Sequence, residues 1–201
     1  MQRIASSPRV LVDAIWSEDS IARDVVLVVA GILAIAASAQ VRIPVPFSLV
    51  PITGQTFAVM LIAALYGPRR GVTTIVAYIT SGAMGLPFFA GGAAGLAYLA
   101  GPTTGYLAGW IGAAWLIGSL MERGWSDRAW RTALAMWLGS LVIFACGVLW
   151  LSRFVGFETA FMTGFLPFIP GDLVKIALAM GVLQAGWKFN KRSRGRLTID
   201  D

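Results

Sequence analysis

The sequence contains no histidine and only one cysteine, Cys146. Histidine-based catalytic triads and zinc sites built from histidine and cysteine are therefore excluded, and a lone cysteine cannot form an intramolecular disulfide. No G-x-x-x-x-G-K-[ST] motif is present, so the chain does not bind ATP through a P-loop. These absences favour a protein that is not an enzyme and that carries neither a metal nor a cofactor.

Charged residues are also scarce. They make up 13% of the chain, against 57% hydrophobic residues, and none occurs between Gly71 and Met121. The mean hydropathy is +0.75. Because one membrane-spanning helix needs only about 20 apolar residues, this run is long enough for two spans and an apolar loop. The composition predicts a protein embedded in the lipid bilayer.

Six stretches have the length and composition of membrane helices, and breaks rich in proline, glycine or arginine separate them. They cover residues 25–39, 53–66, 71–86, 104–121, 132–151 and 168–187. We therefore expect an all-α polytopic membrane protein with six transmembrane helices. Residues 1–24 would form a cytoplasmic lead-in that lies on the surface or is loosely ordered, residues 25–187 the membrane domain, and residues 188–201 a basic cytoplasmic tail.

Lysine and arginine predict the orientation, because cytoplasmic loops carry an excess of both. With both termini in the cytoplasm, only Arg42 and Arg153 of the 16 basic residues fall in outer loops, and Lys175 falls within the last span. The other 13 fall inside: Arg3, Arg9, Arg23, Arg69, Arg70, Arg123, Arg128, Arg131, Lys188, Lys191, Arg192, Arg194 and Arg196. We predict a multi-pass protein of the cell inner (plasma) membrane. A basic rim against anionic headgroups explains the net charge of +6 without nucleic-acid binding.

The first apolar stretch has a second interpretation, because Ala37-Ser38-Ala39 resembles the cleavage site of a signal peptide. The residues before it argue against cleavage. A signal n-region is short and positive, whereas the 24 residues here include four acids, Asp13, Glu18, Asp19 and Asp24. We expect the stretch to remain as the first membrane helix.

The last apolar stretch contains an acid and a base, Asp172 and Lys175, directly after Pro170 and Gly171. Each ionisable residue in a span costs about 2.5–3.5 kcal/mol at the helix centre, so two in one span point to a partner or a ligand. Residues at i and i+3 share one helix face. The alternatives are structural: Asp172 could cap the helix, and Lys175 could reach the water at the interface.

The loop between the third and fourth stretches is rich in glycine and proline but has no charge. Irregular apolar backbone is tolerated at membrane depth where it packs in protein or lines a cavity, so we expect the outer loops to cap a substrate pocket. A flexible loop on the membrane surface is the alternative. Gly101, Gly105 and Gly109 have the four-residue spacing of close helix packing.

Five segments of the chain are long and unusual motifs: Val41-Arg42-Ile43-Pro44-Val45-Pro46-Phe47, Val50-Pro51-Ile52-Thr53-Gly54-Gln55-Thr56, Gly85-Leu86-Pro87-Phe88-Phe89-Ala90-Gly91-Gly92, Gly101-Pro102-Thr103-Thr104-Gly105-Tyr106 and Pro167-Phe168-Ile169-Pro170-Gly171-Asp172-Leu173-Val174-Lys175. Together they resemble the BioY family, the biotin-binding S components of energy-coupling factor (ECF) transporters. The resemblance runs from about Ser38 to Trp187.

The resemblance implies a subunit that captures biotin outside the cell and works with a transmembrane T component and two cytoplasmic ATPases. It places the ligand on Asp172 and Lys175, which suit a ureido ring and a carboxylate. Thr53 and Gln55 are polar candidates, although they could instead satisfy the broken backbone after the prolines. Arg42 is the other outer cation to consider for the carboxylate. Aromatic walls are expected from Phe88, Phe89, Tyr98 and Tyr106.

The family resemblance also implies a docking face of small residues on the first helix. Ala30, Ala34 and Ser38 fit it, because small residues allow a partner helix to approach closely, although they could equally pack inside the chain. An S component, a solitary transporter or a channel for another small solute remains the alternative function. A hydrolase would need a second catalytic group near Asp172 and Lys175, and the sequence offers none.

Overall fold

The computed structural model describes residues 10–16 and 19–197, with side chains as far as Asn190. Two of the residues used to predict the orientation, Arg3 and Arg9, and the side chains of the basic tail beyond Asn190 lie outside this description. The described chain is mostly helical, as the composition predicts.

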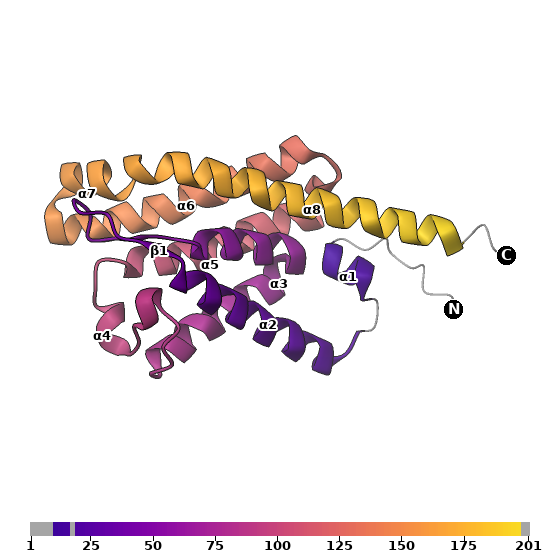
Figure 1. Ribbon diagram of the computed structural model, residues 1–201, viewed down its shortest axis with the longest axis horizontal. Helices are drawn as coiled ribbons and strands as arrows, with labels where there is room; N and C mark the ends of the chain where they lie inside the picture. Colours follow the sequence, from indigo (N-terminus) through magenta and orange to yellow (C-terminus); the bar gives the residue numbers. More distant parts are fainter. Residues whose placement is uncertain (1–9, 17–18, 198–201) are drawn as a thin grey trace.

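Five long helices build the molecule: α2 (Ile21–Gln40), α3 (Gln55–Ala83), α5 (Thr104–Glu122), α6 (Ala129–Val155) and α8 (Ile169–Leu197). The short elements are α1 (Leu11–Ile15), β1 (Arg42–Ile43), β2 (Ile52–Thr53), η1 (Ala90–Gly92), α4 (Leu96–Leu99), η2 (Trp125–Asp127), α7 (Phe157–Gly164) and η3 (Leu166–Phe168). α8 runs the length of the molecule beside α6, and α1 lies at the end opposite β1 and α7 (Figure 1).

α3 contains the second and third predicted helices, joined by a sharp reversal. Gly67 has φ +80° and ψ 178°, a conformation that favours glycine, and Pro68 follows it. The two arms, 55–66 and 68–83, run side by side in opposite directions. A Cβ on Gly71 would lie 3.3 Å from the Cα of Ala63, and the first residue of the helix bonds to Tyr78 in the second arm. The predicted break between the two helices is confirmed.

Other helix boundaries also differ from the predictions, and α6, predicted over 132–151, runs from Ala129 to Val155 and so includes Arg153. α2 begins at Ile21, four residues before the apolar run, because the Ser20 hydroxyl accepts a hydrogen bond from the backbone N–H of Arg23 at 3.1 Å. α8 continues past Trp187 to Leu197, since no proline interrupts the basic tail. Hydropathy marks where a helix stops being apolar, which is not where its backbone hydrogen bonds stop.

Close packing of α5 against α6 uses the predicted glycines. A Cβ on Gly105 would lie 2.3 Å from the Cβ of Trp150, and one on Gly109 would lie 2.8 Å from the Cα of Ile143. Gly101 precedes α5, and its carbonyl accepts a hydrogen bond of 2.9 Å from the Trp150 indole. The predicted packing of small residues is confirmed for Gly105 and Gly109.

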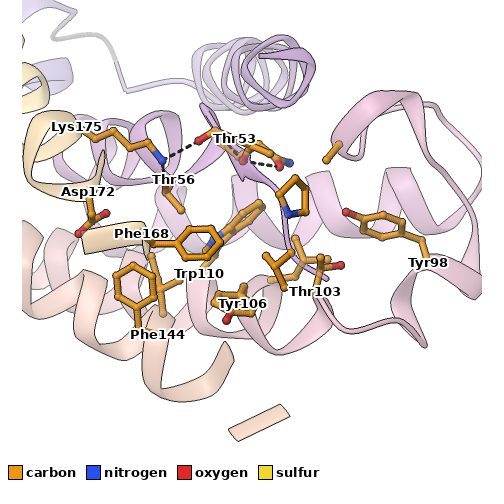
Figure 2. A pocket seen from close by; sticks show the side chains of 16 residues that line it. Thr53, Thr56, Tyr98, Thr103, Tyr106, Trp110, Phe144, Phe168, Asp172 and Lys175 are labelled. Carbon is orange, nitrogen blue, oxygen red and sulfur yellow. Dashed lines mark hydrogen bonds between the residues drawn. The ribbon is translucent and has the colours of Figure 1, made fainter. Parts of the chain in front are cut away.

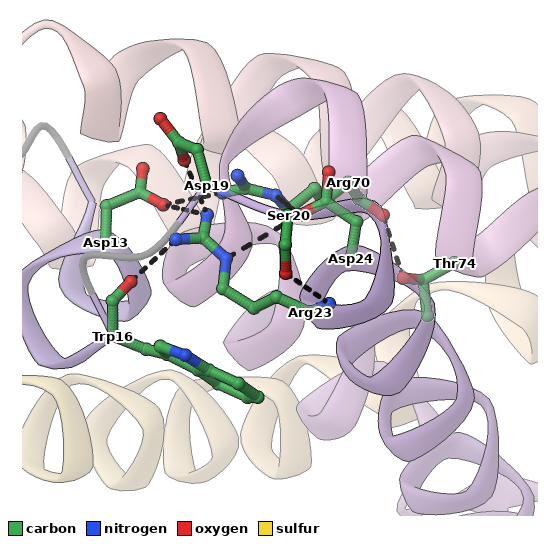
Figure 3. Close-up of polar contacts among 8 residues, drawn as sticks. All are labelled: Asp13, Trp16, Asp19, Ser20, Arg23, Asp24, Arg70 and Thr74. Carbon is green, nitrogen blue, oxygen red and sulfur yellow. Dashed lines mark hydrogen bonds and ion pairs between the residues drawn. The ribbon is translucent and has the colours of Figure 1, made fainter.

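The lead-in is tied to the helices by a network of charges (Figure 3). Arg23 is 1% exposed, and its Nη2 lies 2.8 Å from Asp13 Oδ1. Arg70, just after the reversal of α3, contacts the same Asp13 oxygen and an oxygen of Asp24, each at 2.7 Å. α1 also buries Leu11 and contacts α3 and α8. Where the structure describes it, the lead-in is therefore packed and not loosely ordered.

Three stretches of the described chain are long and apolar enough to cross a membrane: Ile21–Gln40, Ala129–Val155 and Phe157–Asn190. Large apolar side chains remain exposed on them, such as Leu33, Leu149 and Leu178. Exposure of this kind is costly in water and favourable in lipid. The chain is a membrane protein.

Candidate functional site

A cavity lies where the loops before α3 and α5 meet α5, α6 and α8 (Figure 2). It encloses about 570 Å³ of space free of protein atoms, a volume that includes open solvent at its mouth. Its lining residues are Val50, Pro51, Thr53, Gln55, Thr56, Ala90, Tyr98, Thr103, Tyr106, Leu107, Trp110, Ile143, Phe144, Phe168, Asp172 and Lys175. The wall is largely apolar, with a few polar groups.

Asp172 brings a buried carboxylate to this cavity. The residue lies in the first turn of α8, is 7% exposed and interacts with the Ser140 hydroxyl of α6. Within the described part of the chain, no lysine or arginine nitrogen lies within 4.0 Å of its oxygens, and no backbone N–H at the start of α8 bonds to them. The geometry does not support the capping alternative. A buried carboxylate without an ion pair is costly, so this one can gain from a ligand that donates hydrogen bonds.

Lys175 points across the cavity mouth to the start of α3 (Figure 2). Its Nζ donates to the carbonyl oxygen of Thr53 and to Oγ1 of Thr56, both at 2.7 Å. Since an ammonium group has three donors, one remains for a ligand. The side chain therefore bonds to protein groups and does not extend to the water at the interface.

The predicted polar pair Thr53 and Gln55 lines the cavity, and both side chains also hold the backbone around it. The Thr53 hydroxyl donates to Gln55 Oε1 at 3.1 Å and accepts from the Gln55 backbone N–H at 3.4 Å. Gln55 Nε2 donates to the Tyr78 hydroxyl, which in turn donates to the carbonyl of Phe88, both at 2.7 Å. These hydrogen bonds connect the cavity wall to the loop after α3. Thr53 and Gln55 therefore also satisfy backbone groups, as the alternative interpretation expected in part.

Of the four aromatic residues expected to form walls, Tyr98 and Tyr106 line the cavity, whereas Phe88 and Phe89 do not. Tyr106 lines the cavity with its ring, while its hydroxyl donates to the carbonyl of Gly164 at 2.8 Å. Phe89 is fully buried but is not among the lining residues. Its ring stacks on Tyr98, with centroids 4.5 Å apart, and packs where a side chain on Gly82 would stand. Phe89 therefore packs against the lining residue Tyr98 and does not line the cavity itself.

The sequence analysis missed Trp110, which lines the cavity from α5 and is 3% exposed. Its indole Nε1 is buried without a hydrogen-bond partner among the described residues. Trp110 lies one helical turn after Tyr106, so the i, i+4 spacing was a signal that could have found it. Phe144 and Phe168 were also missed; their rings lie 6.3 Å apart and complete the aromatic wall.

The predicted docking residues lie on α2, away from this cavity. Ala30 and Ala34 are exposed and Ser38 is partly exposed, whereas Gly31 and Ile35 are buried against the rest of the chain. Ser38 also donates to the carbonyl of Ile35 at 2.7 Å. Packing inside the chain therefore does not account for the two alanines.

Comparisons with known proteins agree with one another. A family model described as "BioY family" matches residues 7–192. The "Probable biotin transporter BioY" of Pyrococcus horikoshii is 38% identical over 159 residues, covering 79% of this chain and 93% of that protein. The "Biotin transporter BioY" of Thermotoga maritima is 39% identical over 154 residues, covering 76% and 90%. A crystal structure of "the S-component for biotin from an ECF-type ABC transporter" superposes with a TM-score of 0.76 and 25% identity, covering 85% of this chain and 95% of that one.

Proposed function

Because this chain belongs to the BioY family, we propose that it binds biotin and takes part in its uptake across the cell membrane. The support is that relatives covering most of the chain are named biotin transporters and that a similar structure is described as an S-component for biotin. Membership also confirms that the chain is not an enzyme, since the named relatives are transporters.

The observation that carries the proposal is the buried carboxylate of Asp172, which lies on the cavity wall without an ion pair among the described residues. The ureido ring of biotin offers two N–H donors and one carbonyl acceptor. Asp172 accepts from the N–H groups, and the indole N–H of Trp110 donates to the carbonyl. The Trp110 indole N–H, which has no partner among the described residues, would gain one from the ligand, and the Asp172 carboxylate would gain donors beyond the Ser140 hydroxyl.

Lys175 donates a hydrogen bond to the carboxylate of biotin or to its ureido carbonyl. Two of its donors hold Thr53 and Thr56, and the third is available at the mouth of the cavity. The apolar fused rings and the alkyl chain fit between Tyr106, Phe144 and Phe168. These aromatic rings offer the ligand apolar contact area, so the polar groups of the cavity set the orientation of the ligand.

The arrangement in the membrane follows from the charges. Six helical segments cross the bilayer, namely α2, the two arms of α3, α5, α6 and α8, with both termini in the cytoplasm and the cavity toward the outside. The protein would then be a multi-pass protein of the inner membrane. Of the described basic residues outside the last span, only Arg42 in β1 and Arg153 in the last turn of α6 would then lie on the outer side.

Energy for uptake comes from other subunits, because the sequence has no P-loop. We assign this role to a transmembrane T component and two cytoplasmic ATPases, as in an ECF transporter. The exposed Ala30 and Ala34, with Ser38, form the face of α2 to which the T component docks.

The direct test is mass spectrometry of small molecules released by denaturing the purified protein, followed by calorimetry with biotin. We expect released biotin and a saturable 1:1 isotherm, because a cavity with buried polar groups retains a ligand that pairs with them. Release of a different vitamin-sized solute would assign the chain to another S component. No retained solute and no isotherm would point to a channel.

A further inference from the structure

A second cavity lies beside the first and shares with it Pro51, Ala90, Tyr98 and Thr103. It encloses about 690 Å³ of space free of protein atoms, counted to its open mouth. Its other lining residues are Arg42, Leu49, Ala97, Gly101 and Pro102. These residues come from the loops, whereas the first cavity reaches in to α5, α6 and α8, so the second cavity is a vestibule in front of the first.

Arg42 carries the one charge in the lining of this vestibule. The residue is exposed, and no carboxylate of the described chain lies within ion-pairing distance of it. Its guanidinium lies over Gly91, where a Cβ would stand 2.5 Å from Nη1. Gly91 has φ +72°, so both its backbone and the space above it favour glycine. The loop therefore leaves room for a cation whose charge no carboxylate balances.

The strand pairing connects this cation to the inner site. Arg42 in β1 is paired with Thr53 in β2, and the carbonyl of Thr53 accepts the hydrogen bond from Lys175. Thr53 thus adjoins two cations. Arg42 lines the vestibule, and Lys175 lines the inner cavity. An anionic group that enters the vestibule meets Arg42 before it reaches Lys175.

We propose that the vestibule is a capture site for carboxylate ligands, in which Arg42 binds the carboxylate of the incoming molecule before its rings enter the inner cavity. The proposal rests on the proposed function for the identity of the ligand. Charge in a cleft with low-dielectric walls raises the rate at which an opposite charge is captured. Arg42 therefore favours free acids over amides or esters of the same ring system.

The test is stopped-flow binding, followed by tryptophan fluorescence, of biotin and of its uncharged carboxamide to wild type, Arg42→Gln, Arg42→Lys and Arg153→Gln. Arg153 is the matched control, because it is exposed in the last turn of α6 and lies outside both cavities. We expect Arg42→Gln to lower the association rate for biotin about tenfold at low salt, less at high salt, and to leave the carboxamide unchanged. Arg42→Lys should keep most of the rate, and Arg153→Gln all of it.

Three results would overturn this inference while biotin binding itself stays intact. The first is an unchanged association rate in Arg42→Gln. The second is an equal loss in Arg153→Gln, which would show only diffuse surface charge. The third is an equal loss for the carboxamide, which would show that Arg42 shapes the loop. A wild-type protein that binds neither ligand would overturn the proposed function, and this inference with it.

Discussion

Lys175 Nζ donates a 2.7 Å hydrogen bond to the carbonyl oxygen of Thr53, a residue 122 positions earlier in the chain. The bond joins the last helix to strand β2 at the edge of the cavity. The same ammonium holds Thr56 in the first turn of α3. A ligand that accepts a hydrogen bond from Lys175 would therefore contact the same ammonium group that holds the β1–β2 hairpin in place.

Replacing Asp172 with asparagine is expected to weaken biotin binding by about 1.5–3 kcal/mol, or roughly 10–150-fold, because a charged acceptor is lost. Calorimetry in detergent measures the change. Glu158→Gln is the control, since Glu158 is an exposed acid on α7 outside the cavity. Wild-type affinity in Asp172→Asn would show that the carboxylate does not contact the ligand.

Lys175→Met should weaken biotin binding about tenfold or more and also loosen residues 41–53. The methionine keeps the apolar stem but cannot donate to Thr53 or Thr56. Hydrogen exchange of the 41–53 backbone should become faster. Lys188→Met, at an exposed position on the same helix, provides the control. Unchanged exchange in Lys175→Met would mean that other contacts hold the hairpin.

Trp110→Phe separates binding from folding. Without a ligand the indole N–H has no partner in the described chain, so loss of this donor costs no hydrogen bond, and thermal stability in detergent should fall only by the packing that the smaller ring gives up. Biotin affinity should still fall about three- to tenfold, because a neutral hydrogen bond to the ligand is lost. Trp115→Phe is the control, as Trp115 is 60% exposed on the same helix. Equal affinity in both variants would remove Trp110 from the site.

Ala34→Trp should prevent co-purification of the T component while biotin affinity stays within about twofold of wild type, since a bulky side chain blocks close helix approach. Ala34 is exposed and outside the cavity. Leu178→Trp, an exposed substitution on α8, controls for added bulk in lipid. Normal co-purification of Ala34→Trp would place the docking face elsewhere.

Cysteine labelling tests the orientation, starting from a Cys146→Ala background. Arg128→Cys should react with a membrane-impermeant reagent only from the cytoplasmic side and Arg153→Cys only from outside; both positions are exposed. Arg70 is less suitable, because its ion pairs with Asp13 and Asp24 would be lost. Labelling of position 128 in intact cells would contradict the six-span arrangement.

The sequence by itself identified the membrane class, the helices and the acid–base pair of α8. These properties depend on residues that are close in sequence. Apolar runs, breaks at glycine and proline, and the i, i+3 spacing of Asp172 and Lys175 all involve neighbours in the chain. The BioY resemblance was equally local, since it rested on short contiguous motifs. The breaks before Gly71 and around Gly101 fall at turns for the same reason.

Only the tertiary structure decided which side chains meet. Lys175 reaches Thr53, Trp110 lines the cavity and Phe89 does not, and Arg42 lines the adjoining second cavity. Hydropathy indicates that a residue is apolar, but not which helix covers it, and Phe88 and Phe89 look alike in sequence. The close approach of α5 to α6 and of α3 to α5 fixes those neighbours, because it depends on contacts between different helices.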